Sequence, residues 1–343
     1  MVELHPACDP ADGIHDEGDA ELKAVVCTKY GPPEVLQLRE LPKPTPKDNE
    51  VLIRIRAATV MAGDCELRGS KGSLPWQFLL RLGFGFRAPR RKVLGQDLAG
   101  EVESTGNGVT LFKVGDQVFG NTGLRLGAYA QYVCLPEDGL IATKPANTTL
   151  EEAATFPSGG LFVLPLLSQT NIQRGQQVMI IGAAGTMGNI AVQFSKLHGA
   201  EVTGVDSKKK LDMLRSIGAD KVVDYTRQDY THGSETYDVI FDVTGKSPFS
   251  GCVRILKQGG TYVMGNIGPI RVIRGRWASR GGKRIISGFS SYKKTSLDSL
   301  KHLVEEGSLK PLIDRRFTLE EIVEAHRYVD TGEKQGNVVI TVD

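Results

Sequence analysis

The stretch Val178-Met-Ile-Ile-Gly182-Ala-Ala-Gly185-Thr-Met-Gly188 decides how this chain folds. Its four apolar residues at 178–181 predict a buried strand, and the segment 189–198 that follows predicts a helix. Three glycines spaced three apart occupy the turn between them. Such a turn lets a pyrophosphate approach the backbone and lie at the positive N-terminal end of the helix. The stretch therefore predicts a dinucleotide site with contacts from Gly182, Ala184, Gly185, Thr186, Met187 and Gly188.

The bulk composition indicates a globular protein of two domains that acts on a small molecule. At 343 residues the chain is too long for one ordinary core. Its 40% hydrophobic and 24% charged content is ordinary, and 40 glycines favour a turn-rich β domain joined to an α/β domain. The net charge is only +2, and the basic runs at 87–92 and 208–210 are short. Without a basic stripe or a recognition motif, we expect no nucleic-acid partner.

The cysteines and the apolar runs indicate a cytoplasmic protein that does not enter a membrane. The five cysteines are odd in number and scattered, with no Cys-x-x-Cys, which argues against a disulfide framework or a structural zinc lobe. No apolar run approaches the roughly 18 residues that span a bilayer. The first twenty residues are acidic and polar and carry no signal-peptide pattern. We expect residues 1–21 to be a disordered leader.

The rest of the chain divides into two parts with different sequence patterns. Residues 22–148 are β-rich, with predicted strands at 23–28, 51–56, 97–102, 117–119 and 129–134, a proline-rich loop at 41–46, and a flap or short helix within 70–92. Thr149 and Glu152 have the spacing of a helix capping box. From 149 to 312, strands (177–181, 201–205, 221–224, 237–242, 260–265, 284–288) alternate with helices (186–198, 207–217, 247–256, 295–306). This alternation predicts an α/β fold with a doubly wound parallel sheet.

The C-terminal tail does not continue this alternation. A helix near 318–329 and the strand 336–342 resemble the edge of the first domain more than another strand–helix unit. We therefore expect residues 313–343 to return to the first domain.

The glycine turn alone is a weak signal, but Asp206 strengthens it. This carboxylate ends the next predicted strand, 24 residues after Gly182, close to the ~20-residue offset at which an acid meets the ribose hydroxyls. Asp206 favours NAD because it would repel a 2′-phosphate. Ser207 and Lys208–Lys210 offer a hydroxyl and cations at the same place, as does Tyr225 after the following strand. These lysines are alternatively a solvated first helical turn, which the helix dipole disfavours. We favour NADP(H) over NAD(H).

Several segments resemble those of a known family and occur in the same order and at the same spacing along the chain. They are 57–64, Leu94-Gly-Gln-Asp-Leu-Ala-Gly-Glu-Val102, 115–119, 183–188, 218–225 and Gly336-Asn-Val-Val-Ile340. Over 22–343 the chain resembles the medium-chain dehydrogenase/reductase superfamily, and within it the zinc-free, quinone oxidoreductase-like branch. The likeness implies a GroES-like β-rich catalytic domain, a Rossmann domain, an active site in the cleft between them, and commonly a homodimer.

The same likeness implies roles for individual residues. In NADPH-using relatives a Lys and a Tyr at the positions of Lys210 and Tyr225 hold the 2′-phosphate, whereas Asp206 departs from the small neutral residue usual there. Gly265 and Asn266, which end the fifth strand of the second domain, are expected to face the nicotinamide through backbone groups. Asn337 of the closing segment completes the expected cofactor contacts.

The positions that would hold a catalytic zinc carry no suitable ligands. In zinc-containing alcohol dehydrogenases of the superfamily a Cys stands where this chain has Met61, and a His-Glu pair where it has Gln96-Asp97. A thioether and an amide do not form the Cys, His and carboxylate set that zinc requires. We expect Cys65 to be a packed or idle thiol, because none of the six histidines falls near it along the sequence. We therefore expect no metal.

A hydride transfer without a Lewis acid favours quinones and α,β-unsaturated carbonyl compounds, whose conjugation spreads the developing charge. We take Gln96, Asp64 and Tyr129 as candidate catalytic residues, with Met61 and Trp76 in the substrate pocket. Asp64 is alternatively structural. Relatives usually carry Asn at the Met61 position and often Tyr at the Glu66 position, and both departures argue against a proton relay there. Two other functions stay open, namely a zinc-free reductase of another carbonyl or biosynthetic intermediate, and a non-catalytic nucleotide-binding protein.

Overall fold

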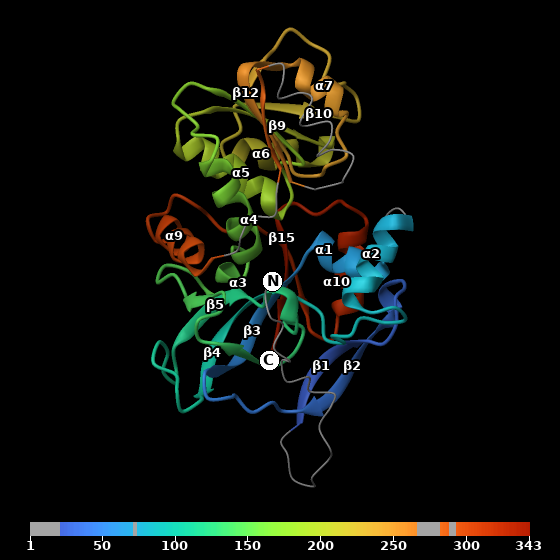
Figure 1. The fold of residues 1–343 in the computed structure, drawn as a ribbon, viewed down its shortest axis with the longest axis vertical. Coiled ribbons are helices and arrows are strands. Elements are labelled where there is room, and N and C mark those ends of the chain that lie inside the picture. Colours follow the sequence, from blue (N-terminus) through green and yellow to red (C-terminus); the bar gives the residue numbers. More distant parts are fainter. Residues whose placement is uncertain (1–20, 71–73, 266–281, 288–292) are drawn as a thin grey trace. The chain divides into compact units, whose positions relative to one another are not determined.

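The computed structural model describes residues 21–70, 74–265, 282–287 and 293–343 (Figure 1). The chain divides into two compact units. Unit 1 comprises residues 1–157 and 313–343, and unit 2 comprises residues 158–312. Except for Glu21, the expected leader at 1–21 lies outside the described residues, as does Asn266.

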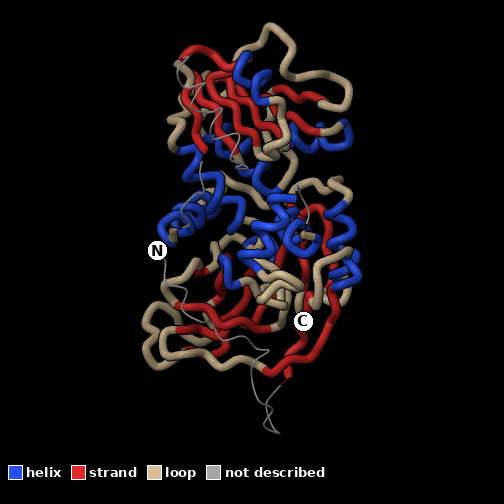
Figure 2. Tube along the Cα trace, turned by 45° about the vertical axis from the view of Figure 1, so that its right-hand side comes forward, coloured by secondary structure: helices blue, strands red, loops and turns tan. Residues whose placement is uncertain are grey.

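Unit 2 is built on one parallel sheet, whose strands lie side by side in Figure 2. Its strands are β8 Gln177–Ile181, β9 Glu201–Asp206, β10 Lys221–Asp224, β11 Tyr237–Asp242, β12 Leu256–Met264 and β13 Arg284–Ser287. Their order is β10-β9-β8-β11-β12-β13, and every pair is parallel. The order reverses between β8 and β11, the switch point at which doubly wound sheets bind ligands. This confirms the predicted doubly wound sheet.

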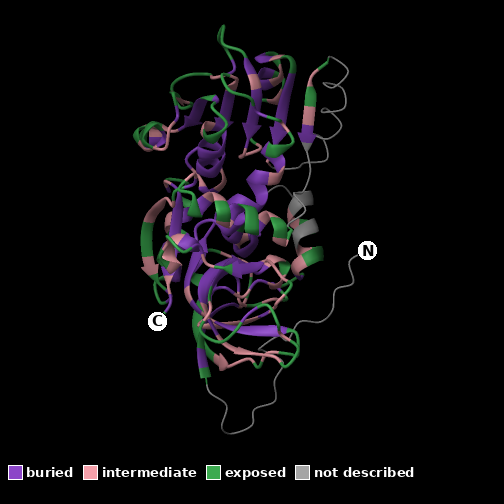
Figure 3. Cartoon of the chain, turned by 90° about the vertical axis from the view of Figure 1, so that its left-hand side faces the viewer, coloured by how far each residue is buried: buried purple, intermediate pink, exposed green. Residues whose placement is uncertain are grey.

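Helices precede, connect and follow these strands. They are α4 Pro157–Ser168, α5 Thr186–Leu197, the short 3-10 helix η3 Lys208–Lys210, α6 Leu211–Ser216, α7 Phe249–Arg254 and α9 Lys294–Glu305. Residues 178–180 of β8 are at most 1% exposed, as expected for a parallel strand covered on both faces (Figure 3). The apolar run at 178–181 is therefore explained by its central place in the sheet.

Unit 1 is β-rich. It contains a two-stranded antiparallel sheet of β1 Glu21–Cys27 and β2 Leu36–Pro42, and a larger sheet in the order β14-β15-β3-β4-β5-β7, with β6 pairing β3. The strands of the larger sheet are β3 Glu50–Val60, β4 Asp97–Thr105, β5 Gln117–Asn121, β6 Tyr132–Pro136, β7 Ile141–Thr143, β14 Ile313–Thr318 and β15 Asn337–Thr341. Strand β15 pairs antiparallel with β3, which brings the end of the chain into the sheet of unit 1.

The helices of unit 1 are short. They are η1 Pro33–Val35, α1 Ala62–Gly69, α2 Leu74–Phe84, η2 Gly123–Arg125, α3 Leu150–Ala153 and α10 Ile322–Asp330. The helix α3 has the predicted capping box, because Thr149 Oγ1 accepts from Glu152 N (3.2 Å) and Glu152 Oε2 accepts from Thr149 N (2.8 Å). The stretch 70–92 contains the helix α2, which is the second of the two alternatives predicted for it.

Several local predictions were wrong at their boundaries. The predicted strand 129–134 begins only at Tyr132, and the helix predicted near 318–329 begins at Ile322, after the strand β14. The predicted helix 247–256 ends at Arg254, because Leu256 already pairs with Tyr237 as the first residue of β12. The predicted loop at 41–46 loses its first two residues to β2, where Leu41 pairs with Leu22. The predicted helix 207–217 is a 3-10 turn followed by α6. Within the described ranges, no helix has the length and apolar character to cross a bilayer.

Candidate functional site

The three glycines of the turn after β8 differ in how much room each leaves for a side chain. A Cβ would fit at Gly185 but not at Gly182 or Gly188. Gly182 has φ +78°, a left-handed conformation that favours glycine. A Cβ on Gly188 would lie 2.1 Å from the carbonyl oxygen of Gly182, so α5 approaches the strand too closely for any side chain. A Cβ on Gly185 would meet nothing nearer than 3.7 Å. Gly182 and Gly188 are thus required by the fold, while the space over Gly185 is open for a ligand.

Asp206, Ser207 and Lys210 come together at the carboxyl end of β9. Asp206 is 6% exposed and accepts from Ala184 N (3.0 Å, Oδ2) and Ser207 N (2.8 Å, Oδ1). The ammonium group of Lys210 lies 3.2 Å from Asp206 Oδ1, and both side chains are buried. Tyr225, half-exposed, donates its backbone N–H to the carbonyl of Asp206. The structure therefore brings the Asp206 carboxylate and the Lys210 ammonium group together, with the backbones of Ser207 and Tyr225 beside them.

Two residues that the sequence reasoning missed lie beside this turn. Thr244 follows β11, and its Cγ2 would be 2.6 Å from a Cβ on Gly182. Asp242, fully buried at the end of β11, accepts from Thr244 Oγ1 (2.9 Å), Gly245 N (2.9 Å) and Tyr262 Oη (3.0 Å). Gly265 N donates to Asp242 O (2.8 Å). The available signal was an Asp-x-Thr-Gly pattern that begins at the last residue of the predicted strand 237–242.

In unit 1, Asp64 and Tyr129 form a buried hydrogen-bonded pair. Tyr129 Oη donates to Asp64 Oδ2 (2.9 Å), which also accepts from the Met61 backbone N–H (2.9 Å) at the start of α1. Tyr129 is 0% and Asp64 3% exposed. The ring of Tyr129 packs on Gly95, where a Cβ would lie 2.5 Å from it. The phenol is therefore held against the loop that carries Gln96.

Burial controls the protonation of this pair. It raises the pKa of Asp64 from 3.8 to about 6, against the opposing effects of its hydrogen bonds with Met61 and Tyr129 and of the nearby Lys334 charge. Burial, and then the charge of Asp64, hold the pKa of Tyr129 well above its ordinary value of 10. The phenol therefore stays protonated and donates a hydrogen bond to the carboxyl group.

The expectation that Cys65 has no histidine partner was wrong. Cys65 Sγ lies 3.3 Å from Nδ1 of His326, which is fully buried in α10. The His326 ring also packs edge-on against Tyr129, with centroids 5.6 Å apart. The two residues are 261 positions apart in the sequence. The contact between α1 and α10 brings them together. Their separation along the sequence therefore did not show that His326 lies beside Cys65.

The remaining predicted residues are placed as follows. Gln96 is half-buried, and its Nε2 donates to Gly123 O (3.0 Å). Met61 is 8% exposed immediately before α1. Trp76 lies in α2, but its side chain is outside the described part of the chain. Asn337, 2% exposed, opens β15 in unit 1. Across the described residues, no group of three or more Cys, His, Asp and Glu side chains could hold a metal ion.

Comparisons with known families and proteins agree with this arrangement. An alcohol dehydrogenase GroES-like domain matches residues 47–145, and a family described as zinc-binding dehydrogenase matches residues 217–340. The chain is 31% identical over 336 residues to a 2-methylene-furan-3-one reductase of Solanum lycopersicum, covering 94% of this chain and 79% of that protein. It is 29% identical over 335 residues to an NADPH-dependent alkenal/one oxidoreductase of Arabidopsis thaliana, covering 93% and 79%.

Solved structures show the same similarity. The quinone oxidoreductase of Coxiella burnetii superposes with a TM-score of 0.84 at 30% sequence identity. The match covers 94% of this chain and all of that one. The match therefore extends across both units, and the combination of a GroES-like domain with a parallel nucleotide-binding sheet is shared.

Proposed function

Because the chain belongs to the quinone oxidoreductase-like branch of the medium-chain dehydrogenase/reductase superfamily, whose members are NAD(P)H-dependent oxidoreductases, we propose that it reduces a quinone or an α,β-unsaturated carbonyl compound without zinc. The proposal is carried by the pair Met61 and Gln96, which the family resemblance places where zinc-containing alcohol dehydrogenases have zinc ligands. The names of the tomato and Arabidopsis relatives supply the same substrate class.

A zinc ion does not fit the residues present. The matched family is described as zinc-binding, but a thioether at Met61 and an amide at Gln96 are not the donors that zinc takes in proteins. The contact between Cys65 and His326 supplies two donors, and within the described ranges no third Cys, His or carboxylate joins them in a metal-binding group. The polarisation of the acceptor therefore falls to hydrogen bonds and to the acceptor's own conjugation.

The nicotinamide cofactor fits unit 2, and we propose NADP(H) rather than NAD(H). When bound, the cofactor supplies the hydride. The open space over Gly185 and the N-terminus of α5 suit the pyrophosphate. The 3.2 Å ion pair with Lys210 offsets the charge of Asp206, which would otherwise repel a 2′-phosphate. Lys210, Ser207 and Tyr225 would then bind that phosphate, as charge-assisted hydrogen bonds to such oxygens are strong.

For the substrate side we propose Gln96 as the residue that binds the acceptor's oxygen. Its Nε2 donates one hydrogen to Gly123 O, which fixes the amide, and Nε2 carries a second hydrogen that is available to a carbonyl. Tyr129 Oη donates to Asp64, and Asp64 also accepts from the Met61 backbone N–H, which supports a role of this pair in positioning the Met61 loop. Water would then supply the proton that completes the reduction. Met61 and Trp76 remain proposed walls of the substrate pocket.

The decisive experiment follows NADPH oxidation with matched acceptors. Menadione and crotonaldehyde should be reduced, crotonaldehyde at its carbon–carbon double bond to give butyraldehyde, whereas butyraldehyde itself should not react. Gas chromatography identifies the product. Reduction of butyraldehyde to the alcohol would favour the alternative of a general carbonyl reductase. No turnover of any quinone or enone, together with tight NADPH binding, would favour a non-catalytic nucleotide-binding protein.

We also propose a homodimer and a reducing, cytoplasmic location. The cysteines of the described part, at positions 27, 65, 134 and 252, are free thiols, which suits a reducing compartment. Light scattering coupled to size-exclusion chromatography tests the dimer. A monomeric mass for the active enzyme would overturn that part of the proposal.

A further inference from the structure

Three large apolar side chains at the end of α2 are exposed to solvent. Phe78, Leu82 and Phe86 are 59%, 54% and 60% exposed. Phe78 and Leu82 are four positions apart in α2, so they share one face of the helix. The ring of Phe86, two residues after the helix, meets the Phe78 ring edge-on, with centroids 6.0 Å apart. The three side chains therefore form one apolar patch, and exposed patches of this kind mark interaction sites.

A tight turn after α2 holds these side chains in place. Gly85 N donates to Arg81 O (2.9 Å) and Arg90 N donates to Phe84 O (2.6 Å), so the chain folds back onto the end of the helix. Gly85 has φ +125°, and a Cβ there would lie 2.2 Å from a backbone oxygen, so this position requires glycine. Tyr30 Oη donates to Gly85 O (2.8 Å). The backbone therefore fixes the turn before any partner binds.

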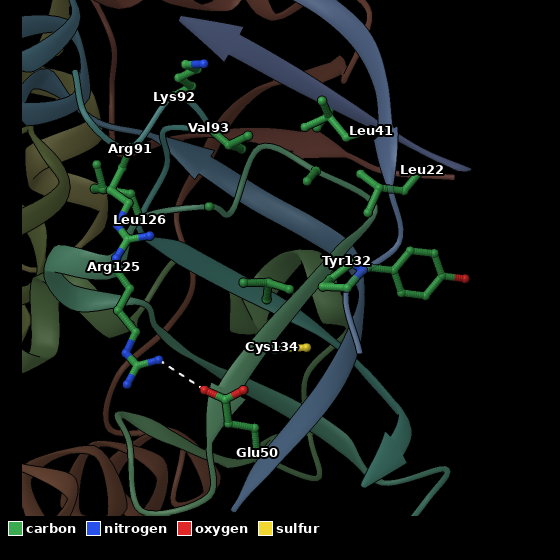
Figure 4. Close-up of a pocket in the computed structure, with 15 residues that line it drawn as sticks. Leu22, Leu41, Glu50, Arg91, Lys92, Val93, Arg125, Leu126, Tyr132 and Cys134 are labelled. Carbon is green, nitrogen blue, oxygen red and sulfur yellow. Dashed lines mark hydrogen bonds and ion pairs between the residues drawn. The ribbon is translucent and has the colours of Figure 1, made fainter. Parts of the chain in front are cut away.

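The chain that follows the turn joins β1. Cys27 N donates to Lys92 O (2.7 Å), and Val93 forms a bridge with Val26. Figure 4 shows Lys92 and Val93 in the wall of a pocket, together with Leu22 of β1. None of the three exposed apolar side chains of the patch lines that pocket. The turn is thus tied to unit 1 on its far side, and the patch is a separate surface.

Positive charge lies next to the apolar side chains. No acidic residue occurs between Glu66 and Asp97, although this stretch contains several arginines and lysines. Arg87 and Arg90 are exposed, and within the described ranges neither forms an ion pair with a carboxylate. Together with the three apolar side chains they make up a surface that we call the α2 patch, which consists of Phe78, Leu82, Phe86, Arg87 and Arg90.

We propose that the α2 patch docks the protein on the surface of an anionic phospholipid bilayer. The apolar side chains would enter the boundary between headgroups and acyl chains, while Arg87 and Arg90 would bind lipid phosphates. The expectation from the sequence that the protein does not enter a membrane rested on the length of its apolar runs. A helix that lies on the bilayer surface does not need the length that spans it.

Two other occupants fit the α2 patch less well. In a twofold dimer through this patch, the same arginines of both copies would face each other, and like charges in contact repel. A protein partner would need a rigid groove that matches three protruding side chains and also carries negative charge. A fluid bilayer adapts to protruding side chains of any shape. It therefore needs only the two properties that the patch has, which are apolar surface and positive charge.

Cosedimentation of the full-length protein with phospholipid vesicles tests the proposal. Vesicles of equimolar phosphatidylcholine and phosphatidylserine should bind the protein at least about tenfold more tightly than pure phosphatidylcholine vesicles, which carry no net charge. Sodium chloride at about 0.5 M should release it, because salt screens the arginines. Binding to neither kind of vesicle, or equal binding to both, would overturn the proposal. The measurement involves no turnover, so this failure would leave the proposed reductase activity standing.

Variants locate the binding. Two of them remove the apolar or the cationic part of the α2 patch, namely Phe78→Ser/Leu82→Ser/Phe86→Ser and Arg87→Gln/Arg90→Gln. Each should weaken binding to the charged vesicles at least about tenfold. The matched control is Leu111→Ser/Val114→Ser, which removes two apolar side chains of unit 1 that are 56% and 63% exposed, and it should leave binding unchanged. Thermal unfolding reports that each variant is folded. Unchanged binding in either α2 variant would refute the site.

Two further readouts separate lipid insertion from the other occupants. An indole introduced by Phe86→Trp, with Trp76→Phe and Trp277→Phe removing the two native tryptophans, should be quenched by brominated phosphatidylcholine in the charged vesicles. Bound protein without quenching would contradict insertion of the apolar side chains. Light scattering tests a contact between copies. A lower mass for the triple serine variant, with unchanged lipid binding, would assign the patch to a second copy and overturn the proposal.

Discussion

Tyr129 Oη lies 2.9 Å from Asp64 Oδ2, and this contact joins two buried groups that are 65 residues apart in the sequence. The same carboxylate oxygen accepts the backbone N–H of Met61, so one side chain fixes both the phenol and the beginning of α1. Because both hydrogen bonds end on Asp64, its protonation state determines how firmly the Met61 loop is held. This relationship makes the pair testable by pH.

We expect Asp64→Asn to change the pH dependence of stability. The folded pKa of about 6 exceeds the ordinary 3.8, so the folded chain holds this proton more tightly than the unfolded chain. The stability that protonated Asp64 contributes is present below pH 3.8 and is lost as pH rises through about 6. At about 1.4 kcal/mol per pH unit, the loss amounts to about 3 kcal/mol. The Asn side chain stays neutral over this pH range, so the Asp64→Asn variant does not show this loss of stability.

Urea denaturation between about pH 4 and pH 7 measures this effect. The stability of Asp64→Asn relative to the wild type should rise across that window. Asp48→Asn, a variant of an exposed carboxylate in the same unit, should show no such rise. A constant difference between Asp64→Asn and the wild type across the window would mean that Asp64 titrates normally.

Gly185→Ala and Gly188→Ala should separate the two tasks of the glycine turn. A methyl group at 188 would lie 2.1 Å from Gly182 O, so Gly188→Ala should lower the free energy of unfolding by about 2 kcal/mol or more. At 185 the nearest atom is 3.7 Å away and φ is −79°, so Ala fits the fold. Gly185→Ala should nevertheless weaken NADPH binding at least about tenfold, because the methyl fills the space of the pyrophosphate. Wild-type NADPH affinity in this variant would place the cofactor elsewhere.

The sequence predicted the parts of the molecule whose signals are local. Uninterrupted apolar runs and the glycine spacing predicted the parallel sheet, and Asp206 falls where its strand ends. The ion pair of Asp206 with Lys210 could also have been predicted from the sequence, because the two residues are four positions apart. Leu256 was assigned to a helix because its place beside Tyr237 depends on a neighbouring strand.

Contacts between distant segments could not be predicted from one sequence. His326 meets Cys65 and Tyr129 only because α10 packs on α1, and nothing in the spacing of these residues indicates it. The buried pair of Asp64 and Tyr129 has the same origin. The candidate residues were identified individually, whereas their partners, and hence their pKa values, required the fold.

Lys210→Gln should weaken NADPH more than NADH. Its ammonium group is buried beside Asp206 and offsets the carboxylate charge. Its removal deletes a phosphate ligand and also exposes a 2′-phosphate to an uncompensated anion. We expect the NADPH dissociation constant to rise at least about tenfold, with a much smaller change for NADH. Fluorescence titration measures both, and Lys208→Gln, an exposed neighbour, is the control. An equal loss for both cofactors would refute the phosphate role of Lys210.

Removal of metal should leave turnover unchanged. Prolonged dialysis against EDTA should not lower the menadione reductase rate, and elemental analysis should find far less than one zinc per chain. Cys65→Ser should not alter the metal content, because the contact with His326 lacks the further donors of a zinc site among the described residues. Stoichiometric zinc that EDTA removes together with activity would contradict the zinc-free mechanism.

The ion pair between Arg68 and Asp330 should be a strong determinant of stability in unit 1. Arg68 is 0% exposed, and its Nη2 lies 2.5 Å from Asp330 Oδ2. Its Nε and Nη1 have no hydrogen-bond partner among the described residues. Asp330→Asn leaves a buried cation without its counter-charge and should cost about 3–5 kcal/mol.

Arg68→Met should cost less than Asp330→Asn, because the Asp330 side chain is 19% exposed and keeps part of its hydration. Combining the two changes should recover much of the loss of Asp330→Asn, since no buried charge then remains. Denaturant titrations of the four proteins at neutral pH measure the coupling. Since α1 and α10 also carry Cys65 and His326, Asp330→Asn should loosen that contact and speed alkylation of Cys65. Additive losses in the double variant would mean that the two side chains do not depend on one another.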